Sequence, residues 1–178
     1  PEVQPILAQR GAYSWNPAVT CELDADRFEA LCFQASNEDL PDAARIELYR
    51  QAVALYQGDL LPKLNHQMWL IPLSVHYHTL YLEAVKALAA LLDRAELFDE
   101  MQLVCQRASS LDNLDEGLHT LIVRSLLRQG KDAAALDHYE KATDLLYRNL
   151  GVRPSEELRA LYTEIMATEK TLETDLGA

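Results

Sequence analysis

The sequence predicts an all-α protein in which about seven helices stack as consecutive hairpins behind a short extended arm. Three observations lead to this prediction. After residue 24, apolar residues recur at three- and four-residue spacing almost without interruption, as in helices that bury one face. Most of the six glycines and seven prolines fall between these stretches. Two segments 34 residues apart also resemble each other, as expected of repeated helical hairpins.

Composition excludes several classes of protein. The chain has 16 Lys and Arg against 28 Asp and Glu, a net charge of −12, and 49% of its residues are hydrophobic. This hydrophobic content supports a folded core and excludes a disordered acidic tail. No apolar run reaches the roughly 18 residues that a membrane span needs, so we expect no membrane partner. The acidic balance predicts that this chain does not itself bind nucleic-acid phosphates.

The cysteine pattern bears on the compartment. Cys21, Cys32 and Cys105 form neither a CxxC pair nor a Cys/His cluster. A chain of this length buries enough surface to fold without disulfides or metals. We therefore expect a reducing, cytoplasmic location.

The first 23 residues differ from the rest of the chain. Residues Ile6–Trp15 alternate loosely around Gly11, which predicts a short strand or a hairpin arm. Tyr13 and Trp15 are two residues apart and share one face of an extended segment. A short arm has little core of its own, so these rings pack either on the helices or on a neighbouring domain.

From residue 24 onward, the predicted helices have recognisable ends. Asn113 and Glu116 have the spacing of a capping box, which satisfies free backbone amides at a helix start. Gly58 and Gly151 stand where a left-handed residue ends a helix, and Pro154 opens the last one. The expected helices cover about residues 24–36, 42–57, 70–92, 96–110, 114–129, 131–150 and 155–170.

The apolar stripes also predict core residues. The inner faces of the first two helices are expected to carry Phe28, Leu31, Cys32, Ala35, Ile46, Tyr49, Val53 and Tyr56. Three aromatic residues, Trp69, Tyr77 and Tyr81, lie near the start of the long third helix. We predict that they belong to the core and do not stack on a cofactor.

The 34-residue self-similarity indicates how the helices pack. With Gly130 at an inter-helix turn, Ala135, Tyr139 and Ala142 take the small, aromatic and small positions of the tetratricopeptide (TPR) pattern. The earlier unit is degenerate, with Met101, Cys105 and Ala108 at those positions and Glu96 in place of the glycine. Small residues let antiparallel helices approach to ~8–10 Å, and each hairpin buries its second face against the next. We therefore predict TPR-like stacking; a generic helical bundle with accidental agreement is the alternative.

Motifs for metal, cofactor or catalytic chemistry are not evident in the sequence. His76 and His78 are two residues apart in a predicted helix, so they point in different directions and do not chelate one ion. His119 lies three residues from Glu116, but a third ligand is not evident. The sequence has neither a GxGxxG nor a GxxxxGK[ST] phosphate loop. We expect no metal, no cofactor and no catalytic residues, and hence no enzyme.

Several segments carry a resemblance to a known family. The segment Leu55–Pro62 reads LYQGDLLP and is followed by Trp69; the others are Leu118–Gly130, Ala134–Tyr139 and Asn149–Leu158, which reads NLGVRPSEEL. Together they resemble the bacterial transcriptional activator domain (BTAD), the TPR-like effector domain of SARP-type transcriptional regulators. The similarity covers roughly residues 24–169. The first and last segments together are fairly specific.

The resemblance implies a division of the protein. In that family a winged helix-turn-helix DNA-binding domain precedes the TPR-like domain. Residues 1–23 would be an arm that ends such a domain, residues 24–170 the effector domain and residues 171–178 a tail. Tyr13 and Trp15 would then contact the upstream domain. DNA would be bound only through that domain, and the partners of this chain would be a second protomer or the transcription machinery.

TPR geometry also predicts a groove. The first helix of each hairpin lines the concave side, where repeat positions place a set of polar residues together: Glu83, Lys86, Arg94, Thr120, Arg124 and Arg128. The four basic members would bind an acidic peptide, another protomer or an anionic ligand. The alternative is that they form salt bridges with nearby acidic residues.

Two rival functions follow from this groove. One is a TPR adaptor that recruits an acidic peptide and has no role in transcription. The other is a sensor in which an anionic small molecule occupies the groove. The function implied by the family resemblance is a non-enzymatic effector or oligomerisation domain of a transcriptional activator.

Overall fold

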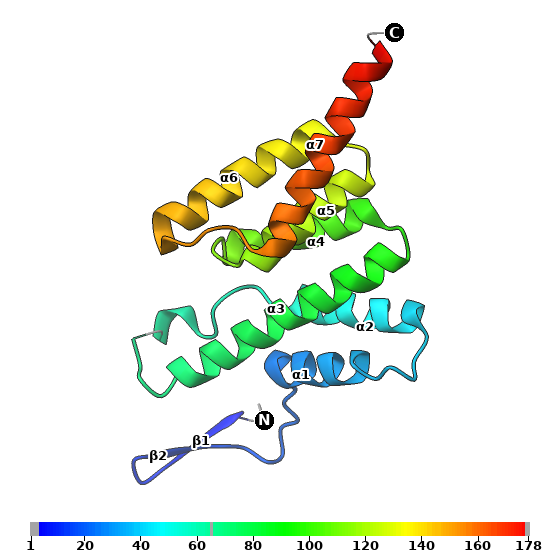
Figure 1. Cartoon of the computed structure of the whole chain (residues 1–178). Helices are drawn as coiled ribbons and strands as arrows, with labels where there is room; N and C mark the ends of the chain where they lie inside the picture. Colours follow the sequence, from blue (N-terminus) through cyan, green and yellow to red (C-terminus); the bar gives the residue numbers. More distant parts are fainter. Residues whose placement is uncertain (1–3, 65, 177–178) are drawn as a thin grey trace.

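The computed structural model describes residues 4–64 and 66–176, and within them the chain forms a two-stranded hairpin, seven α-helices and one short 3₁₀ helix (Figure 1). The elements are β1 (Ile6–Gln9), β2 (Ala12–Trp15), α1 (Asp24–Ala35), α2 (Asp42–Leu55), η1 (Pro62–Leu64), α3 (Ile71–Arg94), α4 (Phe98–Leu111), α5 (Glu116–Arg128), α6 (Asp132–Leu150) and α7 (Glu156–Leu176). This confirms the predicted fold class and the number of helices.

The extended arm is a β-hairpin. β1 and β2 pair antiparallel, with Ile6 opposite Trp15. Arg10 and Gly11 join them with φ angles of 48° and 81°. Two consecutive positive φ angles give the tight turn whose twist matches that of the strands. Figure 1 places the hairpin beside α1, at the opposite end of the helical stack from α7.

Consecutive helices form antiparallel pairs that stack along the chain (Figure 1). α1 packs on α2, α3 on α4 and α5 on α6, and α7 packs on both α5 and α6. α1 also contacts α3, α3 contacts α5 and α5 contacts α7, so the odd-numbered helices lie side by side. This is the TPR-like arrangement that the sequence predicted.

The 34-residue repeat is visible in the backbone of the two inter-helix turns. Glu96 and Gly130 both have left-handed φ angles, 58° and 68°. The turn hydrogen bonds repeat as well: Leu97 N donates to Leu92 O and Lys131 N to Leu126 O, both at 2.9 Å. The two turns are therefore equivalent, although one has glutamate where the other has glycine.

The core runs through the stack as one cluster of buried side chains. The residues predicted for the inner faces of α1 and α2 are all buried. The repeat positions that pack α4 and α6 on their partners are also buried: Met101, Cys105, Ala108, Ala135 and Ala142. Tyr81 is buried and Tyr77 is partly buried, as predicted.

The prediction for Trp69 is wrong, because its side chain is 59% exposed. α3 begins only at Ile71, so Trp69 lies in the turn before the helix. It is therefore outside the apolar stripe that α3 turns toward the core. Its neighbour Leu70 is buried in its place.

The start of α5 also differs from the prediction. The N-cap is Asp115, whose side chain accepts a hydrogen bond from Leu118 N at 3.1 Å, and not Asn113. Glu116 accepts from Ser155 N at 2.7 Å instead of closing a capping box. The chain after α4 makes a turn in which Leu114 N bonds to Asp112, and this turn delays the helix.

The ends of α6 and α7 follow the predicted signals in part. Gly151 ends α6 with a φ angle of 67°. α7 then continues to Leu176, so the segment expected as a tail at residues 171–178 is helical as far as it is described. Gly58 has a positive φ of 133° but lies three residues beyond the end of α2.

Candidate functional site

The basic residues predicted to line a groove do not form a free cationic cluster. Each basic residue pairs with a carboxylate that belongs to another helix or to the N-cap of another helix. The pairs are Lys86–Asp115 at 2.6 Å, Arg94–Asp42 at 3.0 Å, Arg124–Glu157 at 2.6 Å and Arg128–Asp93 at 3.6 Å. This arrangement is the alternative that the sequence left open. Partner binding by these four side chains stays a prediction.

The other two residues of the predicted groove lie in different environments. Thr120 is only 3% exposed, and its hydroxyl donates to Glu116 O at 2.9 Å within α5. It faces the interior of the stack. Glu83 is exposed and lines a hollow between α3 and α1. The six residues therefore do not share one surface.

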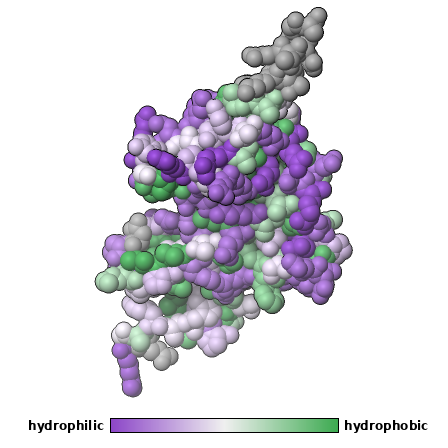
Figure 2. Space-filling view, viewed as in Figure 1, coloured by the Kyte–Doolittle hydropathy of each residue, from purple (hydrophilic) through white to green (hydrophobic). Residues whose placement is uncertain are grey.

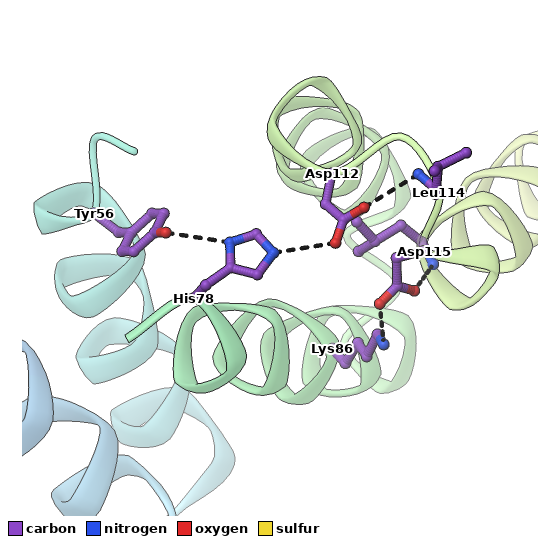
Figure 3. Close-up of polar contacts among 7 residues, drawn as sticks. Tyr56, His78, Lys86, Asp112, Leu114 and Asp115 are labelled. Atoms are coloured by element: carbon purple, nitrogen blue, oxygen red, sulfur yellow. Dashed lines mark hydrogen bonds and ion pairs between the residues drawn. The ribbon is translucent and has the colours of Figure 1, made fainter. Parts of the chain in front are cut away.

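Lys86 and Asp115 join α3 to the start of α5 (Figure 3). Asp115 uses one carboxylate oxygen for the Lys86 ammonium and the other for Leu118 N. Gly117 makes this possible, because a Cβ there would lie 3.2 Å from Lys86 Cε and 3.0 Å from Asp115 Oδ1. One carboxylate thus caps α5 and fixes it against α3.

A second polar chain runs from α2 through α3 to the end of α4 (Figure 3). Tyr56 Oη lies 3.2 Å from His78 Nδ1, and His78 Nε2 lies 3.1 Å from Asp112 Oδ2. Since the carboxylate accepts, His78 Nε2 donates to it, and the other ring nitrogen contacts the Tyr56 phenol. Burial raises the pKa of Asp112, but hydrogen bonds from His78 and the Leu114 amide outweigh it and lower that pKa.

A pair of histidines, His119 buried and His138 partly buried, lies between α5 and α6. His119 Nδ1 is 3.1 Å from His138 Nε2, and His119 Nε2 is 2.9 Å from Asn113 O. Because a carbonyl only accepts, His119 carries its proton on Nε2 and accepts from His138. Burial, with a smaller effect of His119, lowers the pKa of His138 to about 4. The His138 ring is therefore neutral at physiological pH.

The LYQGDLLP segment forms one wall of a cavity of about 470 Å³ between the start of α1, the end of α2 and α3. Phe28, Tyr56 and Tyr77 contribute aromatic surface, and Asp24 and Asp59 contribute charge. The sequence singled out this segment for its resemblance but not as a cavity wall. Its closely spaced glycine and proline were the available signal for a loop that stands away from the helices.

Two surfaces expose large apolar side chains. On the hairpin these are Ile6, Tyr13 and Trp15. The second surface precedes and begins α3: Leu61, Leu64, Met68, Trp69, Ile71, Leu73 and Val75. Figure 2 shows green atoms gathered on the left, where η1 and the start of α3 lie. Contiguous exposed apolar surface is typical of a site that contacts another protein or domain.

The described residues offer little reactive chemistry. No group of three His, Cys, Asp or Glu side chains within residues 4–64 and 66–176 is placed to hold a metal ion. Cys32 and Cys105 are buried thiols; burial raises the pKa of Cys105 to about 12 and, with Glu29 and Glu83, that of Cys32 to about 11. No helix in the described part of the chain has the length and apolarity needed to cross a membrane.

Comparison with known proteins assigns the chain to a family. Residues 23–166 match the model of the bacterial transcriptional activator domain. A solved structure of Mycobacterium tuberculosis EmbR in complex with a low affinity phosphopeptide is similar in fold, with a TM-score of 0.68 and 20% identity. That match takes in 92% of this chain and 44% of the EmbR chain, so this chain spans less than half of that relative. A search of curated proteins found no match. The family model covers most of the sequence, and the chain therefore belongs to the bacterial transcriptional activator domain family.

Proposed function

We propose that this chain is the effector domain of a DNA-binding transcriptional activator and acts through contacts with a neighbouring domain, a second protomer or the transcription machinery. The observation that carries the proposal is the family match over residues 23–166. In this proposal residues 1–23 end a winged helix domain that reads DNA, and residues 24–170 form the effector body. The net charge of −12 supports this division, because an acidic chain is a poor ligand for DNA phosphates.

The hairpin is the proposed contact with the DNA-reading domain. In the antiparallel register, Ile6 faces Trp15 and Ala8 faces Tyr13, so these side chains share one face of the ribbon. Tyr13 is 81% exposed. Trp15 is partly held, since its Nε1 donates to Val19 O at 2.8 Å and orders the linker toward α1. An isolated two-stranded ribbon is marginal by itself, which supports a partner on this face.

The test compares three forms of the full-length protein in DNA-binding and reporter assays. Deletion of residues 24–178 should leave sequence-specific DNA binding and abolish activation. Tyr13→Ala should reduce activation by about threefold or more, since tyrosines are enriched among the interface residues whose truncation costs over about 1 kcal/mol. Tyr147→Ala is the matched control: this tyrosine is 65% exposed on α6, and its truncation should leave activation unchanged.

Two results would contradict the proposal. Full activation by the protein lacking residues 24–178 would show that this domain has no effector role. Equal effects of Tyr13→Ala and Tyr147→Ala would remove the hairpin as the interdomain contact.

A further inference from the structure

A groove separates α1 from α3, and we call it the α1–α3 groove. It has a volume of about 580 Å³, and the residues that matter here are Glu29, Cys32, Phe33, Glu83, Ala84 and Ala87. A second hollow of about 440 Å³ adjoins it and shares Phe33 and Ser36. Phe33 therefore stands between two hollows. The second hollow lies over the end of α1 and the loop that follows it, with Asn37 and Leu40 in its lining.

The floor of the groove is apolar and its rim carries an exposed ring. Cys32 and Ala84 are buried at the floor, together with Tyr49 from α2. Phe33 is 80% exposed, although it lies within α1 and lines both hollows. An aromatic side chain left in water beside an apolar depression is typical of a surface that a partner covers.

The charge around the groove is negative. Glu29 and Glu83 line it from opposite helices, and both lie close enough to Cys32 to raise the pKa of its thiol. Glu29 accepts from His76 Nε2 at 2.6 Å, whereas no cation in the described part of the chain lies within ion-pair distance of Glu83. Arg45 lies beside Tyr49, but it is held by Ala35 O at 2.9 Å and Asp42 at 3.9 Å.

We propose that the α1–α3 groove binds a segment of a partner protein in which an arginine lies one helical turn from an apolar residue. The guanidinium would pair with Glu83 and Glu29 and stack on Phe33, and the apolar side chain would occupy the space above Ala84 and Ala87. Arginine fits better than lysine, because its planar group binds carboxylates in a bidentate manner and stacks on aromatic rings. The inference deepens the proposed function by giving the chemistry of the partner.

The groove selects against other occupants. An anionic peptide or metabolite would face two carboxylates. A second copy of this chain carries a net charge of −12 and would approach against mutual repulsion. The basic residues considered for an acidic partner are each paired elsewhere in the stack.

The test measures binding of the 178-residue chain to a fluorescent helical peptide in which leucine and arginine alternate, one helical turn apart. The measurement is made at about 0.15 M salt, so that distant charges are screened. A second peptide replaces each arginine with citrulline, which keeps the shape and removes the charge. The arginine peptide should bind at least about tenfold more tightly, because charged hydrogen bonds add 1.5–3 kcal/mol each. Glu83→Gln and Phe33→Ala should each weaken binding by about five- to tenfold.

Glu140→Gln is the matched control, because it removes one exposed negative charge on α6, outside the groove. It should change affinity by less than about twofold, as screening at this salt predicts. Thermal unfolding of each variant checks that the fold is kept.

Three outcomes would overturn the inference. Equal weakening by Glu83→Gln and Glu140→Gln would mean that the acidic chain attracts the peptide without a site. Equal binding of the citrulline peptide would remove the role of charge. If sedimentation shows that Glu83→Gln dissociates a dimer of the chain, the groove is filled by a second copy instead. None of these results depends on the reporter assay with Tyr13→Ala, so the proposed function and this inference fail separately.

Discussion

The hairpin α3–α4 and the hairpin α5–α6 are two copies of one unit, and their differences show where the stack is open. Their turns have the same backbone and the same hydrogen bonds 34 residues apart. Ala84 and Ala87 of α3 correspond to Leu118 and Leu121 of α5. Ala84 and Leu118 both belong to the core, and Ala87 and Leu121 both pack against it, but only the two alanines line the α1–α3 groove. The smaller side chains at these two positions therefore coincide with the groove between α1 and α3.

The two units also differ in the polarity of two equivalent positions. His119 and His138 occupy the positions that Val85 and Val104 take in the first unit, where both valines join the core. The second unit therefore has a hydrogen-bonded histidine pair where the first has two apolar side chains. Four predictions test this contrast.

The largest effect is expected for Asp115→Ala. This carboxylate caps α5 and binds Lys86 at 2.6 Å, with only 13% of its side chain exposed. Loss of the cap and of a partly buried ion pair should lower the free energy of unfolding by about 2–3 kcal/mol. Glu83→Gln, in the α1–α3 groove, is the comparison. It should change the free energy of unfolding by less than about 0.5 kcal/mol. Urea unfolding of the two variants measures the difference, and equal values would contradict the contrast.

The second prediction concerns the pH dependence of stability, to which His138 of the second unit contributes. The pKa of His138 is about 4 in the folded chain and near 6.5 when unfolded. The unfolded state therefore takes up a proton first, so stability is complete above pH 6.5 and is lost as pH falls toward 4. We expect a loss of about 1–2 kcal/mol, less than the full shift implies because the ring is partly exposed.

His138→Gln provides the control for this loss. Its amide still donates to His119 Nδ1, but it does not titrate. Urea unfolding between pH 7 and pH 4.5 should show a shallower loss of stability for this variant than for the natural chain. Parallel curves would show that the pair does not contribute to the pH dependence.

The third prediction concerns a substitution that gives the first unit a side chain of the second. Ala87→Leu places in α3 the side chain that Leu121 supplies in α5. It should fill the α1–α3 groove and weaken binding of the arginine peptide by about tenfold or more, with a stability change below about 1 kcal/mol. Ala90→Leu, at an exposed position of the same helix, is the control and should leave binding unchanged. Unchanged affinity of Ala87→Leu would show that the peptide binds elsewhere.

Local signals in the sequence predicted the helices, the repeat and the core, because each depends on spacing or on a single turn residue. Gly130 and Gly151 adopt the left-handed conformation that their positions implied. The predicted burial of Trp69 and the predicted N-cap of α5 were wrong, since both depend on the turn that precedes a helix. The spacing of apolar residues predicted that Arg124 and Arg128 lie on α5. Their partners Glu157 and Asp93 lie on α7 and α3, so the pairs exist only in the packed structure. Pairing between helices is a property of the tertiary structure, so the spacing of Arg124 and Arg128 along the chain does not indicate their carboxylate partners.

The smallest effect separates the two turns. Glu96 holds a φ of 58° that an L-residue adopts with strain, whereas Gly130 holds 68° without it. Glu96→Gly should therefore stabilise the chain by about 0.5–1 kcal/mol, even though glycine costs entropy when the chain is unfolded. Gly130→Ala should destabilise it by about 1 kcal/mol, although no atom lies within 4 Å of the added Cβ. Opposite signs in thermal unfolding would show that the turns are equivalent in backbone and differ only in the residue that occupies them; two losses of stability would mean that the Glu96 side chain contributes contacts that offset its strain.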